Sequence, residues 1–124
     1  MTTKPSLIQP SRFTRHTFDV ADGGRRWAVT GHRRAGWGIA RHGSAWAVYH
    51  LPTGLRVCDE LGKLDQAKSL CDTLEANLGG HALQALAAQP FGAAPQPGTD
   101  AYQDAVQVWQ VLTVWRHTVG AVSA

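Results

Sequence analysis

The stretch AWAVYHLPTGLRV, residues 45 to 57, decides the expected fold. It alternates like two strands, 45 to 51 and 55 to 58, that fold over the turn LPTG. Pro52 presets the backbone φ angle that such a turn needs, and Gly54 closes it. We therefore expect a β-hairpin at this point of the chain.

Three further strand-like runs precede the hairpin, at 13 to 20, 25 to 33 and 36 to 41. They are separated by DGG at 22 to 24 and by HGS at 42 to 44. Both are turn signals, because glycine adopts the positive φ angles that tight hairpins require. This spacing predicts a four- or five-stranded antiparallel meander.

Helical periodicity follows the strands. The clearest helix is expected over 64 to 78, where apolar residues recur on one face and Gly79 and Gly80 end the pattern. A shorter helix is expected over 81 to 88, and a C-terminal helix over 102 to 119. The expected fold class is α+β: a meander with one helix packed on one face, plus a C-terminal helix.

The domain organisation follows from these elements and from composition. Residues 1 to 11 are expected to form a flexible N-terminal arm, and 12 to 89 the domain of meander and helix. Residues 90 to 100 contain three prolines and two glycines, which is typical of a linker. Residues 101 to 124 would then carry the C-terminal helix.

Alternation divides the meander into two expected faces. The apolar face, which the helix over 64 to 78 would cover, consists of Trp27, Val29, Trp37, Ile39, Trp46, Val48, Leu55 and Val57. The opposite face combines small residues with basic and aromatic ones, and its candidate site residues are Arg26, His32, Arg34, Tyr49 and Arg56.

Charge is unevenly distributed along the chain. Residues 1 to 57 hold nine Lys and Arg against two Asp and Glu, whereas residues 58 to 124 hold three against seven. The net charges of +7 and −4 are consistent with the overall charge of +3. Eight of the nine cations in the basic half are arginines, which suit bidentate contacts with phosphate or carboxylate.

These features predict a non-catalytic protein that binds nucleic acid, with single-stranded DNA as the favoured form. In this hypothesis Arg26, Arg34, Arg56 and His32 contact phosphates, and the ring of Tyr49 stacks on a base. The shared face in the alternation and the charge of the basic half are its two supports.

The C-terminal helix offers alternatives. Its interface residues would be Trp109, Leu112 and Trp115, which share one stripe. The helix could cover the second face of the sheet, or pair with its copy in a homodimer. A protein–protein adaptor or inhibitor that acts through this Val/Trp stripe is therefore the rival function.

Catalysis is not expected. No pair of histidines has a compact metal-binding spacing, so neither a metal nor another cofactor is predicted. Cys71 falls inside a helical stripe, where nothing would activate its thiol, and the only adjacent carboxylates are Asp59 and Glu60. No signal peptide, membrane span or disulfide framework is evident, which favours the cytoplasm.

The sequence WAVYHLPTGLRV followed by LDQAKSLCDTLEAN resembles a pattern in short uncharacterised proteins of phages, plasmids and integrative elements. There, a Trp-x-Val-x-His strand and a Thr-Gly turn lead through a further strand into a helix. The resemblance covers roughly residues 46 to 78 and implies a mobile-element protein, but no activity and no catalytic residue. The order of strands and helix is also similar to that of transcriptional-coactivator-type single-strand DNA binders, an analogy of arrangement.

Overall fold

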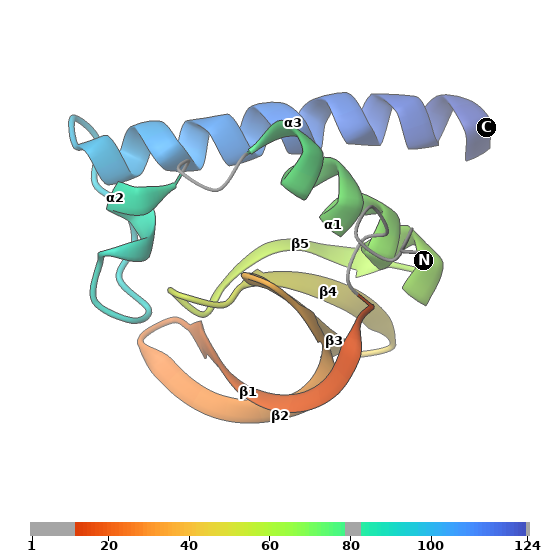
Figure 1. Ribbon diagram of the computed structural model, residues 1–124, viewed down its shortest axis with the longest axis horizontal. Helices are drawn as coiled ribbons and strands as arrows, with labels where there is room; N and C mark the ends of the chain where they lie inside the picture. Colours follow the sequence, from red (N-terminus) through yellow and green to blue (C-terminus); the bar gives the residue numbers. More distant parts are fainter. Residues whose placement is uncertain (1–11, 79–82, 124) are drawn as a thin grey trace, which may run out of the picture.

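The computed structural model describes residues 12–78 and 83–123, with five strands followed by three helices. The strands are β1 (Thr14–Asp22), β2 (Arg25–Arg34), β3 (Trp37–His42), β4 (Ala45–His50) and β5 (Leu55–Leu61). The helices are α1 (Leu64–Asn77), α2 (Gln84–Ala87) and α3 (Asp100–Ser123). Figure 1 shows the helices gathered on one side of the strands, with β1 and β2 on the side away from α3.

The predicted antiparallel meander is confirmed with all five strands in chain order. The first turn of the meander depends on two glycines, Gly23 and Gly24, whose φ angles are 57° and 79°. They connect Asp22 with its register partner Arg25. Two successive positive φ angles give a turn whose twist matches that of the flanking strands. Gly43, with φ of 65°, supplies a single positive φ angle to the β3–β4 turn.

The meander closes into a barrel, which the sequence did not predict. The N–H of Ala21 at the end of β1 donates to the carbonyl of Gly54 over 2.8 Å, and Ala21 pairs in parallel with Leu55 at the start of β5. The closing contact joins β1 and β5 at this one register pair. Closure turns one face of the sheet into an enclosed interior.

Phe18, Val20, Ala40, Ala47 and Tyr49 form the cluster inside the barrel. Small residues make room for the large ones. At Gly38, the register partner of Tyr49, an added Cβ would lie 2.8 Å from the Phe18 ring. The alanines and glycine of β3 and β4 therefore form part of the core, rather than an exposed floor.

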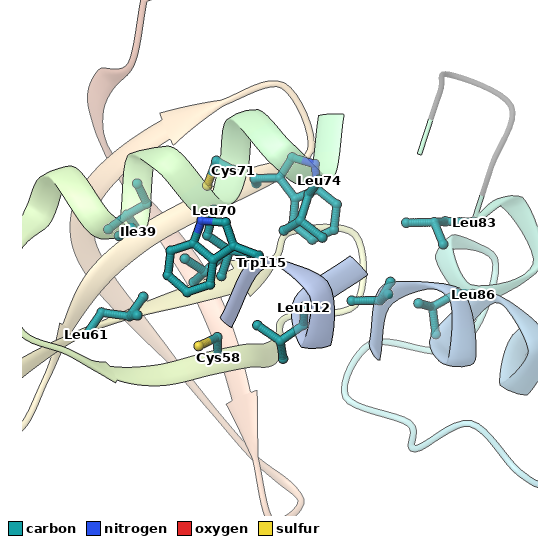
Figure 2. Packing of buried hydrophobic residues seen from close by; sticks show 14 of the residues in the cluster. Ile39, Cys58, Leu61, Leu70, Cys71, Leu74, Leu83, Leu86, Leu112 and Trp115 are labelled. Atoms are coloured by element: carbon teal, nitrogen blue, oxygen red, sulfur yellow. The ribbon is translucent and has the colours of Figure 1, made fainter. Parts of the chain in front are cut away.

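A second, larger core lies between the outside of the barrel and the helices. The predicted helix over 64 to 78 is confirmed, and its buried stripe is Ala67, Leu70, Cys71 and Leu74. Figure 2 shows the ring of Trp115 from α3 in this cluster, together with Leu70 of α1 and Cys58 of β5. The indole N–H of Trp115 donates to Ser69 Oγ over 3.2 Å, which ties α3 to α1.

The remaining elements differ from the predicted ones only in where they begin and end. The C-terminal helix begins at Asp100, before the predicted residue 102, and the short helix is α2, while residues 81 and 82 lie outside the described part. The expected arm of residues 1 to 11 also lies outside it. In the expected linker, Gly92 N–H donates to the Thr53 carbonyl over 2.8 Å, so the segment contacts the barrel. Within the described ranges, no helix is both long and apolar enough to cross a membrane.

Candidate functional site

The barrel register divides the five predicted site residues between different surfaces. A two-residue turn at Ala35 and Gly36 pairs Arg34 with Trp37, and His32 with Ile39. Paired residues on neighbouring strands point to the same side of a sheet. His32 and Arg34 therefore lie on the outer, helix-bearing side of the barrel, which they share with Trp37 and Ile39.

The expected single face is thus wrong, and the reason is the parity change at a two-residue turn. Such a turn pairs even-numbered positions of one strand with odd-numbered positions of the next. Trp27 illustrates the consequence: we expected it in the core beside Trp37, whereas it pairs with Val20 and is 39% exposed.

Tyr49 belongs to the barrel interior and is 2% exposed. Its ring centroid lies 6.5 Å from that of Phe18, and burial raises the pKa of its hydroxyl above the ordinary value. A ring enclosed in this way has no face available to a base. The predicted stacking role of Tyr49 therefore has no support in its position.

Each of the three arginines that were predicted as site residues forms an ion pair with a carboxylate. Arg26 pairs with Asp19 over 2.7 Å. Arg56 lies 3.3 Å from Asp22 and 3.2 Å from Asp59. These contacts compensate much of the charge that a phosphate would otherwise meet.

Arg34 is the most deeply placed of the three, since its side chain is only 8% exposed. Its guanidinium contacts both Asp72 and Glu75 of α1. The guanidinium carbon also lies 4.3 Å from the centroid of the Phe13 ring. Arg34 therefore fastens α1 to the end of β2, which is a structural role.

A different set of cations lies around the outer ends of β1 to β4, beside α1. Arg15 is the register partner of His32, and Arg41 is the register partner of Trp46. The Arg41 guanidinium carbon lies 5.0 Å from the centroid of the Trp46 ring, and the His32 ring centroid lies 5.9 Å from it. We call this the cationic patch: Arg15, His32, Arg41, Trp46 and Lys68.

The electrostatics of His32 show the sign of the field in this patch. Its pKa is lowered from the ordinary value, first by burial and then by the positive charges of Lys68 and Arg15. Across the described ranges, no carboxylate forms an ion pair with Arg15, Arg41 or Lys68. The patch thus carries uncompensated positive charge next to a half-buried indole ring.

Phe13 extends the aromatic part of this surface. The ammonium of Lys68 lies 5.7 Å from the centroid of its ring, which is a contact of the cation–π kind. Cations held beside aromatic rings suit a ligand that offers phosphates and flat bases together. An isolated anion would use only the charges.

Sequence reasoning found His32 and missed the other members of the patch. The signal for Arg41 and Trp46 was present, because the two-residue turn at Gly43 and Ser44 makes them partners. Lys68 gave no such signal, since it reaches the patch through the packing of α1 against the barrel. No local pattern encodes that packing.

Burial governs the chemistry of Cys71 and His50. Burial raises the pKa of the Cys71 thiol to about 12, so the thiol is protonated at neutral pH and a poor nucleophile. In the described part of the chain, no group of three or more His, Cys, Asp or Glu is placed to hold a metal ion. His50 is buried, and burial lowers its pKa to about 4.

The C-terminal stripe is used mainly within the chain itself. Leu112 and Trp115, predicted as interface residues, are 7% and 6% exposed in the core beside α1. Trp109 is 49% exposed and has an edge contact with Tyr102. The proposed homodimer interface therefore loses two of its three residues to intramolecular packing.

Comparisons with known proteins give no relative from which a role could be carried over. No family model, no curated protein and no solved structure matches this chain. Its function is therefore inferred from its own residues.

Proposed function

We propose that this protein binds single-stranded nucleic acid, in a non-catalytic role, through the cationic patch. The observation that carries the proposal is the guanidinium of Arg41 against the Trp46 ring, with no ion pair to a carboxylate in the described part of the chain. Phosphates would meet Arg15, Arg41 and Lys68, and a base would stack at Trp46.

The form of the ligand follows from the shape of the contact. The Trp46 ring can stack only on a base that is not already stacked inside a duplex, as in a single strand. Sequence readout is not expected, because stacking and phosphate contacts tolerate any base. We extend the proposal to the cytoplasm and to the DNA of a mobile element on the sequence pattern of residues 46 to 78 alone, which resembles that of short proteins of phages and plasmids.

The test is fluorescence anisotropy of a labelled oligothymidylate, and of a duplex of matched length, titrated with the full chain across a salt series. We expect the single strand to bind more tightly than the duplex, and affinity to fall steeply as salt rises. Failure to bind either probe at low salt would refute the proposal, and so would salt-independent binding.

The rival function, an adaptor that acts through α3, now rests on the exposed Trp109 and Val114. The variant Trp109→Gln separates the two, because Trp109 lies outside the cationic patch. Under our proposal this variant binds oligothymidylate as the natural chain does. The adaptor would be favoured if neither the natural chain nor the variant bound oligothymidylate, and if the variant lost self-association or the capture of a partner protein.

A further inference from the structure

A cavity of about 390 Å³ lies where the barrel meets α2 and α3. Leu55 of β5, Leu86 of α2 and Val108 of α3 contribute to its walls, and the β1–β2 turn contributes Gly23 and Gly24. Neither glycine has an atom within 4 Å of the place where a Cβ would stand, so this wall leaves space open. The volume falls in the range of sites that hold small organic molecules.

Most of the lining is aliphatic or aromatic, which favours an apolar occupant. Trp109 lines the cavity and is 49% exposed, so one wall is accessible from solvent. Ala105 lies on the same helix, is 6% exposed, and is small enough to leave the space unfilled. The binding of an apolar ligand is favourable when it displaces water from a surface of this kind.

His50 supplies a directional polar group in this lining. The residue is 5% exposed, and its Nδ1 lies 2.9 Å from the hydroxyl oxygen of Thr53. The Thr53 hydroxyl lies within hydrogen-bond distance of Nδ1 and of the His50 carbonyl, which is 3.3 Å away, so Thr53 satisfies Nδ1 and Nε2 is the ring nitrogen left for a ligand. No hydrogen bond joins Nε2 to any residue of the described ranges.

The charged groups at the cavity are already paired with one another. Arg56 lines it together with Asp22, 3.3 Å away, and Asp59 lies on the other side of the same guanidinium at 3.2 Å. An anionic ligand would therefore meet an arginine that is already paired. A cation would have to leave water for a largely apolar space, which costs free energy.

We propose that this cavity binds a small neutral aromatic molecule of the phenol type, whose hydroxyl forms a hydrogen bond with Nε2 of His50 while its ring lies against the apolar walls. The site is separate from the cationic patch. Its occupation does not depend on nucleic-acid binding.

The binding of 4-fluorophenol to the full chain is measured by ¹⁹F NMR. Its two matched analogues are 4-fluoroanisole, which lacks the donor, and 4-fluorobenzoate, which is charged. We expect 4-fluorophenol to bind with saturation, and each analogue to bind at least about tenfold more weakly. Binding of the anisole or the benzoate as tight as that of the phenol would overturn the assignment to a neutral hydroxyl group.

Two variants locate the binding. Ala105→Leu fills the cavity from α3, and Leu55→Phe fills it from β5. Circular dichroism shows whether each variant folds, and if one does not, the other tests the site. The matched control is Ala76→Leu, on the exposed side of α1. We expect each folded filling variant to lose binding and the control to retain it. Absence of binding to the natural chain, or undiminished binding to a folded filling variant, would refute the proposal.

Discussion

Arg41 on β3 and Trp46 on β4 are register partners, and the guanidinium carbon of Arg41 lies 5.0 Å from the centroid of the Trp46 ring. The contact holds a cation against an aromatic face at the barrel surface. It contrasts with Arg34, whose charge is met by two carboxylates of α1. The arginines of this chain thus differ in role according to what faces them.

The first prediction concerns the salt dependence of binding. Three cations of the patch, each releasing counterions from one phosphate, give a slope of log K against log salt of about −2 for a single strand. The double variant Arg15→Gln/Arg41→Gln should bring that slope to about −0.7 and weaken binding at low salt. Anisotropy titrations at several salt concentrations measure both quantities.

Its control removes the same charge elsewhere. Arg25→Gln/Arg116→Gln changes two exposed arginines outside the patch, so we expect the salt slope to stay near that of the natural chain. Equal loss in both double variants would mean that net charge, rather than the patch, governs binding.

The second prediction is that Arg34 acts on stability. Arg34→Met should lower the free energy of unfolding by about 1–3 kcal/mol, because it leaves Asp72 and Glu75 without their shared cation. Asp72→Asn/Glu75→Gln should cost at least as much, since the buried guanidinium stays in place. Urea unfolding measures both, with Arg33→Met on the exposed neighbour as control. An Arg34 variant as stable as its control would contradict this role.

The third prediction tests close backbone packing in the barrel. An added Cβ at Gly31 would lie 2.0 Å from the carbonyl oxygen of Ile39, and backbone cannot swing aside as a side chain can. Gly31→Ala should therefore destabilise the chain by about 3 kcal/mol or prevent folding. Gly36→Ala meets no atom within 4 Å and should change stability by less than about 1 kcal/mol. Similar melting temperatures for the two variants would argue against this packing.

The fourth prediction concerns pH. The pKa of His50 is about 4 in the folded chain against an ordinary 6.5, because burial disfavours the charged ring more than the carboxylate of Asp104 favours it. The unfolded chain therefore takes up a proton first as pH falls. Stability from this group is complete above about pH 6.5 and declines down to about pH 4, by about 3 kcal/mol.

Urea unfolding across this pH range, on the natural chain and on His50→Gln, isolates the contribution. The pH dependence should be smaller in His50→Gln, whereas His16→Gln, on an exposed residue of β1, should retain it. Parallel curves for the natural chain and His50→Gln would show that His50 is not the group responsible.

The fifth prediction separates Tyr49 from binding. Tyr49→Leu should lower the free energy of unfolding by about 2–4 kcal/mol, because the ring fills the barrel interior with Phe18. Tyr49→Phe keeps the ring and should bind oligothymidylate like the natural chain. Weaker binding by a stable Tyr49→Phe would return this residue to the binding surface.

Local chemistry explains how much of the fold was predictable. Strand alternation, glycines with positive φ angles and the apolar stripe of α1 act over a few residues, so the five strands and the helix over 64 to 78 could be predicted directly. The periodicity of α3 outweighed the preference of its valines and tryptophans for strands. Each of these signals is contained in the segment that it describes.

The tertiary structure alone decided which residues share a surface. The turn at Ala35 and Gly36 fixed the parity between β2 and β3, and closure of β1 on β5 enclosed Tyr49. Carboxylates of α1, distant in the sequence, compensated Arg34, while Lys68 of the same helix joined the cationic patch. Sequence by itself determined the elements, because their signals are local. The barrel register and the packing of α1 determined the site, because burial and charge compensation depend on residues far apart in the chain.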